Sequence, residues 1–316
     1  MLHIEPPPVS ILQGLLSSTL VSSPTYGHLL LEQTVSPVDD ATVGALRPYF
    51  ESAHLDAREV FHKAARISLH PEDGARGSHA TYPTCLPPKT TRGLFGEVMA
   101  GMIAQAYSLV GSKKWDVPIF LFRYHGPVGA YIFDLVRDPS RTREVHGRPG
   151  NDFIGLELGP NLAVTAFIAG EAKWRSDLTA SAMDTMMKGD GQGKGAARVF
   201  ENNGVWNDIN NALAVPQGLQ QICDLLVEKD KNLFHDTIVS LDEALLGVGT
   251  PPPRTDLVLV AGNRSPSRPK GAALLPTAAP PPECSSKRPL QVVEIVLEGG
   301  EELIDRIYKS LWKANG

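Results

Sequence analysis

The sequence predicts an α/β protein in which helices cover a mixed β-sheet. From residue 93 onward, an apolar helical segment at 93–110 is followed by strand-like segments and then by segments with helical spacing. Two more apolar runs with strand character, 257–261 and 292–297, come near the C-terminus. Strands that alternate with helices favour a sheet with helices on its faces. The 316 residues are enough to build a large core.

The N-terminal third is organised differently. Residues 40–69 show helical spacing of apolar residues, and residues 71–91 are rich in Pro, Gly, His and Thr, which is typical of a loop. We therefore divide the chain into an N-terminal region of unknown role, 1–90, with helical character, and a domain that spans 91–316.

The strands expected in the middle of the chain lie close together in sequence. Ile119–Tyr124 and Val128–Val136 are joined by a His-Gly-Pro turn, which predicts a hairpin. Asn151–Leu158 is a short strand, and Val164–Ala169 has the length and apolar content of a buried one. A helix is expected from about 176 to 187.

The C-terminal part predicts two helices near 196–213 and 217–228, after a glycine-rich break. Residues 263–289 are full of Pro, Ala and Ser, and we expect this segment to be disordered. An amphipathic helix is expected at 301–312. Together with the last strands, it would form a C-terminal β/α extension of the domain.

Charge and composition exclude several classes of protein. The formal net charge of −5 argues against a globally basic nucleic-acid binder, although it allows a local basic channel. The three cysteines are far apart and lack metal-site spacing, which indicates a reducing compartment. The N-terminus does not have the pattern of a signal peptide, and no apolar run approaches membrane-spanning length. We therefore expect a cytoplasmic protein without a membrane partner.

The stretch AVTAFIAGEAKWR, residues 163–175, carries the strongest indication of chemistry. A buried strand ends at Gly170 and delivers Glu171 and Lys173, whose side chains point to the same face of an extended strand. A carboxylate there can hold a divalent cation, and the ammonium can orient a water. Because a Glu-x-Lys triplet alone is often an exposed charge pair, further acids are needed to support this interpretation.

Two more acids occur where such a site needs them. Asp152 lies at the start of the preceding strand, and Glu97 is the lone acid of the apolar helix at 93–110, next to Gly96, which allows close approach of another element. Asp134 is a rival for the strand acid, and the sequence leaves the choice between Asp134 and Asp152 open.

At these positions the sequence resembles the PD-(D/E)xK nuclease superfamily, which has the restriction-endonuclease-like fold. Its pattern is an acid on a helix, an Asp on a strand, and (D/E)-x-K on the next strand. GLFGE, GNDF and GEAK match it within residues 93–187, although Asn151 replaces the usual Pro before the Asp. The combination looks most like the family of nuclease subunits of the Hachiman anti-phage defence system.

The resemblance implies specific roles for these residues. Asp152 and Glu171 would bind Mg²⁺, or Mn²⁺ in its place, with the carbonyl of Ala172. Lys173 would contact the scissile phosphate or the attacking water, and Glu97 would support the metal or a further water. It also implies DNA as the substrate, a helicase subunit as the partner, and a defence role.

Basic residues near the triplet are candidates for nucleic-acid contacts. We single out Arg175 and, beside the glycine-rich break, Lys188 and Lys194. The break itself, GDGQGKG, does not match a phosphate-binding loop, since no Ser or Thr follows the lysine. Two alternatives stay open: a non-catalytic interaction subunit on a nuclease-like scaffold, and a nuclease that acts on RNA.

Overall fold

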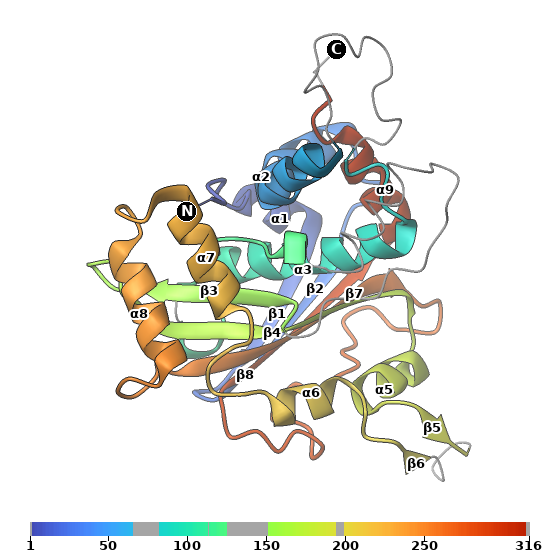
Figure 1. Cartoon of the computed structure of the whole chain (residues 1–316). Coiled ribbons are helices and arrows are strands. Elements are labelled where there is room, and N and C mark those ends of the chain that lie inside the picture. Colours follow the sequence, from blue (N-terminus) through green and yellow to red (C-terminus); the bar gives the residue numbers. More distant parts are fainter. Residues whose placement is uncertain (1, 66–81, 113, 125–150, 194–198, 314–316) are drawn as a thin grey trace.

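The computed structural model describes residues 2–65, 82–112, 114–124, 151–193 and 199–313. Within these residues, a six-stranded sheet lies between two layers of helices (Figure 1). The α/β class predicted from the sequence is therefore confirmed.

The sheet is mixed, and its order is β1-β2-β8-β7-β4-β3. The four central strands, β2, β8, β7 and β4, run parallel, while β1 and β3 pair antiparallel at the two edges. The strands are β1 (Leu16–Ser22), β2 (Tyr26–Gln33), β3 (Phe153–Leu158), β4 (Val164–Leu178), β7 (Arg254–Arg264) and β8 (Leu290–Leu297). A separate ribbon pairs β5 (Gly191–Gln192) with β6 (Val199–Phe200).

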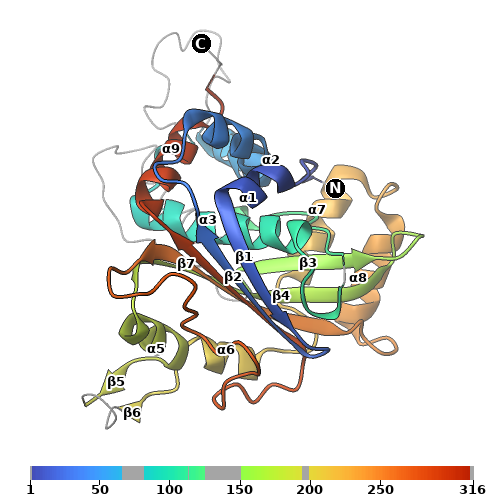
Figure 2. The same ribbon diagram turned by 180° about the vertical axis from the view of Figure 1, so that it is seen from behind.

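Helices cover both faces of the sheet. One face packs against α1 (Val9–Leu15), α2 (Asp40–Ala65), α3 (Pro88–Ala106) and α9 (Gly300–Ser310). The other packs against α5 (Ala180–Lys188), α6 (Val205–Asn211), α7 (Leu219–Asp230) and α8 (His235–Leu246). Short 3₁₀ turns lie at Val110–Ser112 and Phe122–Tyr124. The two views from front and back show this layering (Figures 1 and 2).

The central strands read as continuous apolar runs because both of their faces are covered. All eight residues of β8 and the first nine of β7 are buried, as parallel strands between two helix layers require. Successive residues of β4 pack into the hydrophobic cores on opposite faces of the sheet. Ile168 packs on the α3 side, and Phe167 packs beneath α7 and α8.

The N-terminal region belongs to this same sheet. Strand β2 pairs in parallel with β8, with Leu29 beside Val293, and α2 shares the core cluster of α3 and α9. The expected division at residue 90 therefore differs from the fold, since residues on both sides of it build one sheet. The parallel pairing of β2 with β8 joins segments more than 250 residues apart, and local sequence patterns do not encode such a contact.

The expectation that 263–289 is disordered is wrong. Buried carboxylates of the sheet hold this segment: Glu294 accepts hydrogen bonds from the backbone N–H groups of Leu274 and Leu275, and Glu32 accepts one from that of Gly271. A buried carboxylate needs such partners, and here the coil supplies them. Composition alone misses this, because the partners are backbone groups.

Other local expectations differ in detail. Residues 119–121 form no strand and lead into a 3₁₀ turn, while 128–136 lie outside the described residues. The helix expected at 196–213 is the shorter α6. Among the described helices, none combines the length and the apolar content that crossing a bilayer requires.

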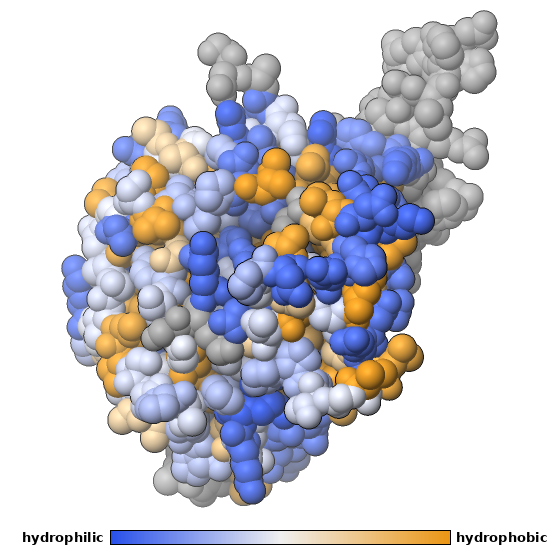
Figure 3. Space-filling model, turned by 90° about the vertical axis from the view of Figure 1, so that its left-hand side faces the viewer, coloured by the Kyte–Doolittle hydropathy of each residue, from blue (hydrophilic) through white to orange (hydrophobic). Residues whose placement is uncertain are grey.

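The surface over α7 and α8 mixes apolar and polar side chains. Exposed apolar residues occur on both helices, yet hydrophilic residues separate them (Figure 3). Scattered apolar residues of this kind are ordinary on a protein surface.

Candidate active site

Two of the predicted acids, Asp152 and Glu171, meet the predicted lysine, Lys173, where β3 and β4 begin to pair. Phe153 pairs with Gly170, and the N–H of Asp152 donates to the carbonyl oxygen of Gly170 at 2.9 Å. This register sets the Asp152 side chain beside the residues that follow Gly170. A Cβ at Gly170 would lie 1.7 Å from the carbonyl oxygen of Leu257, so only glycine lets β7 approach here.

Lys173 joins two carboxylates. Its Nζ donates to Asp152 Oδ2 at 2.9 Å and to Glu171 Oε2 at 2.6 Å. The backbone N–H of Ala172 donates to the same Asp152 oxygen at 3.1 Å. Three of the four predicted catalytic side chains, those of Asp152, Glu171 and Lys173, therefore form one contiguous cluster. Asp134, the rival strand acid, lies outside the described residues.

Glu97 lies on the α3 side of the sheet. Ala172 faces α3, since a Cβ placed on Gly96 would be 3.6 Å from the Ala172 Cβ. Glu171 and Lys173, one residue to either side of Ala172, extend from the opposite face. Burial raises the pKa of Tyr82 and of Tyr308 on α9, and the charge of Glu97 raises both further. The charge of Glu97 thus acts on Tyr82, which precedes α3, and on Tyr308 of α9, and at Gly96 even an added Cβ would make only an ordinary contact with Ala172.

Burial and charge perturb the titration of the cluster. Burial and the nearby charge of Asp152 raise the pKa of Glu171 to about 8, against the opposing effect of Lys173. Burial lowers the pKa of Lys173, but the carboxylates of Asp152 and Glu171 outweigh it and raise that pKa overall. Lys173 therefore remains an ammonium at neutral pH, while Glu171 takes up a proton easily.

The oxygen atoms of the cluster are of the chemical type that could hold a small divalent cation. Both carboxylates reach one point, because a single Nζ contacts both. The N–H of Ala172 points to Asp152, and the carbonyl of a strand residue points to the same strand edge as its N–H, so the Ala172 oxygen faces this side too. Two carboxylates and one carbonyl, completed by water, are a typical Mg²⁺ set. The described residues contain no group of three or more His, Cys, Asp or Glu side chains able to hold a metal.

Asp208 on α6 is a further candidate residue of this site, and the sequence analysis did not identify it. Burial raises its pKa, the charge of Lys173 lowers it, and that of Asp152 raises it, so all three groups lie within electrostatic range. No sequence signal marks it, because it is one acid in a short polar helix. Only the packing of α6 against the sheet brings it near the cluster.

A buried ion network anchors α6 beside the site. Asp256, which is fully buried, accepts from Arg254 Nε and from Arg288 Nε, each at 2.8 Å. The arginines also donate to backbone carbonyls at the end of α6 and just after it, those of Ile209, Ala212 and Leu213. They thereby satisfy carbonyl groups that a helix end leaves without partners. The charge of Glu171 also acts on Arg254.

The predicted nucleic-acid contacts divide into three cases. Arg175 is exposed and continues the row of Glu171 and Lys173 on the same face. Lys188 is paired with Asp184 at 3.0 Å and Glu283 at 3.1 Å, which offsets its charge. Lys194 lies outside the described residues.

Trp174, which follows Lys173 on β4, is partly buried and packs against the core. Its ring meets Phe95 edge-on, with centroids 5.8 Å apart. The tryptophan therefore helps fix β4 against α3.

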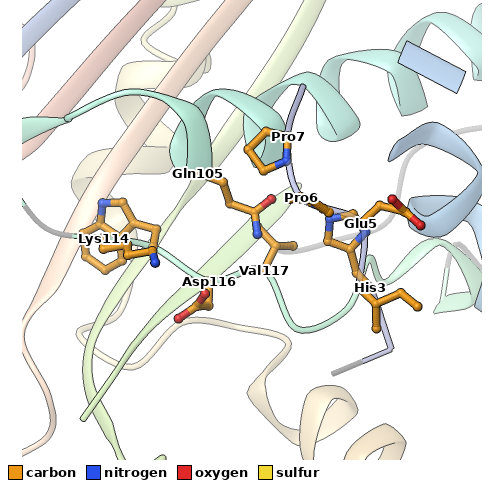
Figure 4. Close-up of a pocket in the computed structure, with 10 residues that line it drawn as sticks. His3, Glu5, Pro6, Pro7, Gln105, Lys114, Asp116 and Val117 are labelled. Carbon is orange, nitrogen blue, oxygen red and sulfur yellow. The ribbon is translucent and has the colours of Figure 1, made fainter. Parts of the chain in front are cut away.

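A separate cavity of about 320 Å³ opens where the N-terminal segment crosses the end of α3 (Figure 4). His3, Gln105 and Asp116 are among the residues that line it. Burial lowers the pKa of His3 to about 4, so its imidazole is neutral, and its Nδ1 lies 2.9 Å from Ser52 Oγ. These residues help seat the N-terminal segment, and they share no contact with Lys173.

No protein-family model matches the chain, and no curated protein matches it either.

Proposed function

We propose that the protein is a divalent-cation-dependent nuclease that hydrolyses phosphodiester bonds in DNA. The observation that carries the proposal is the single lysine held between Asp152 and Glu171 at the start of the β3–β4 pairing. A lysine beside two carboxylates that can share a cation supplies the groups that phosphodiester hydrolysis needs.

Each residue has a defined task in this proposal. Asp152, Glu171 and the carbonyl of Ala172 would hold Mg²⁺ or Mn²⁺, which when bound polarises the phosphate and lowers the pKa of a coordinated water. Lys173 would leave its position between the carboxylates and orient the attacking water or the phosphate. Arg175, exposed on the same face, would contact the substrate backbone. Asp208 would add negative charge across from Lys173.

The topology supports a restriction-endonuclease-like fold. Helix α3 precedes the antiparallel pair β3–β4, and helices then lead to β7, which runs parallel to β4. The order of α3, β3 and β4 is the one that the sequence resemblance implies. The helicase partner, the defence role and the cytoplasmic location are proposals that rest on the sequence alone.

The test is a cleavage assay on duplex DNA, single-stranded DNA and RNA with Mg²⁺ and with EDTA. Glu171→Gln and Lys173→Met are expected to lower the DNA cleavage rate by at least about 100-fold, because each removes a group from the reacting centre. Asp177→Asn changes an exposed acid on the same strand and serves as the matched control. Melting curves establish that the variants fold.

Three outcomes contradict the proposal. Cleavage that persists in both variants rules out this site, and cleavage that persists in EDTA rules out the cation. A rate on RNA far above that on DNA would change the substrate class.

A non-catalytic interaction subunit is the second candidate, and one observation favours it. Lys173 already forms ion pairs with both carboxylates and offsets part of their charge, as it would in a cluster that keeps its shape without a cation. A calorimetric titration with Mn²⁺ separates the two functions, because only the nuclease requires the ion to displace the ammonium.

A further inference from the structure

Strand β1 is an open edge of the sheet. It pairs only with β2 among the described strands, and Figure 2 shows it on the near side of the sheet. Six of its seven residues are exposed, and they include Leu20 at 47% and Val21 at 42%. Both faces of β1 and its outer backbone edge therefore meet solvent.

The register identifies the backbone groups on the outer edge. Leu15 accepts from the N–H of Thr34, and Ser23 donates to Tyr26, so odd-numbered residues of this segment bond to β2. The N–H and C=O groups of the even-numbered residues point away from β2. These residues are Leu16, Ser18, Leu20 and Ser22.

Nothing in β1 blocks the pairing of another strand. Its sequence, LSSTLVS, has no charge and no proline, and its register with β2 is unbroken. The opposite edge, β3, is protected: it carries Glu157, its register shifts after that residue, and Asp116 bridges to Leu156 on the outside. Natural sheets usually block an edge by such devices, and β1 lacks all of them.

We propose that β1 pairs antiparallel with β1 of a second copy of this chain, about a twofold axis at Thr19. This register sets Ser18 opposite Leu20 of the other copy, so outward-pointing groups meet outward-pointing groups. About six hydrogen bonds can form, because the N–H of Leu16 already donates to the carbonyl oxygen of Leu12 at the end of α1. A second copy of β1 is a suitable partner because the strand is uncharged, so symmetric pairing brings no like charges together. The pairing also places Thr19 opposite Thr19, and Thr–Thr is a favourable cross-strand pair.

The proposed dimer keeps the two candidate active sites apart. Strand β4 is four spacings from β1, so nine spacings of about 4.8 Å, roughly 43 Å along the sheet, separate β4 from its counterpart. The sites lie toward opposite ends of the joined sheet, and each acts by itself. This inference does not depend on the proposed nuclease function.

A cysteine scan tests the register directly. In the symmetric pair, Thr19 lies opposite Thr19 at a non-hydrogen-bonded position, where Cα atoms are about 4.5 Å apart, within disulfide reach. Thr19→Cys is therefore expected to give a reducible covalent dimer under mild oxidation. Val21→Cys is the matched control, since the two copies of residue 21 would lie about 13 Å apart. The unsubstituted chain controls for the three native cysteines.

Sedimentation analysis tests the interface without a cross-link. The full chain is expected to be a dimer, and Ser18→Pro is expected to be a monomer that keeps the β1–β2 ladder, since it removes only an outward N–H. Leu20→Lys should act in the same way by charging the edge. Far-ultraviolet circular dichroism and melting curves check the fold of both variants.

Several results would overturn the proposal. A chain that stays monomeric at its highest soluble concentration has no such interface, and a dimer that survives both substitutions uses another surface. Equal cross-linking of Thr19→Cys and Val21→Cys refutes the register. If the chain is monomeric and a different protein pairs with β1, that protein and not a second copy is the partner of this edge.

Discussion

The raised pKa of Glu171 predicts that cation binding depends steeply on pH. The carboxyl must lose its proton before a cation can replace it, and its pKa is about 8 because of burial and the charge of Asp152. Affinity is therefore expected to rise with pH up to about 8 and to level off above it. Lys173 does not titrate in this range, since the two carboxylates raise its pKa.

The size of the effect follows from the pKa. At pH 6, two units below about 8, roughly one molecule in 100 has an ionised Glu171. The apparent affinity should then be about 100-fold below its plateau. Each ion bound at pH 6 should release about one proton from the site, and each ion bound at pH 9 almost none.

The assay is isothermal titration calorimetry with Mn²⁺ between pH 6 and 9, in buffers of different ionisation enthalpy, so that proton release is measured directly. Glu171→Gln should lose both the proton release and most of the affinity, and Asp177→Asn should match the unsubstituted chain. An affinity that stays flat across this range, or proton release that Glu171→Gln retains, would refute the reasoning.

Three further predictions concern the scaffold of the site. Gly170→Ala should lower the free energy of unfolding by about 1–3 kcal/mol, because its Cβ would fall 1.7 Å from a β7 carbonyl oxygen. Gly96→Ala should instead be neutral or stabilising by up to about 1 kcal/mol, because its added Cβ makes only ordinary contacts at 3.6 Å. Urea unfolding measures both variants, and a destabilised Gly96→Ala beside an unaffected Gly170→Ala would contradict these two contacts. Asp256→Ala should cost about 3–5 kcal/mol in the same assay, because it leaves Arg254 buried without its carboxylate, and a loss below about 1 kcal/mol would show that the network is not needed.

The core of the candidate site was predictable because it is nearly local. Glu171 and Lys173 share a strand, and the alternation of side chains along a strand puts them on one face. Asp152 begins the neighbouring antiparallel strand, so a short connection brings it to the same place. Glu97 was harder to place, because which way a helical side chain points depends on how α3 rotates against the sheet.

Asp208 and the ordered segment 263–289 could not be predicted in this way. Asp208 comes near Lys173 only because Asp256, Arg254 and Arg288 dock α6 against the sheet. The proline-rich segment is held by Glu294 and other buried carboxylates that bind its backbone N–H groups, and a backbone group carries no signature in the amino-acid composition.

The sequence by itself determined the α/β class, the buried strand that ends in a carboxylate and an amine, and the acid that leads the neighbouring strand. These features follow from short-range periodicity. Tertiary structure alone decided that β2 joins the sheet beside β8, that the two carboxylates share one lysine, and that β1 is left at an open edge. The reason is physical: parallel pairing and ion-pair networks bring together residues distant in the chain, and their free energy depends on the burial that the whole fold creates.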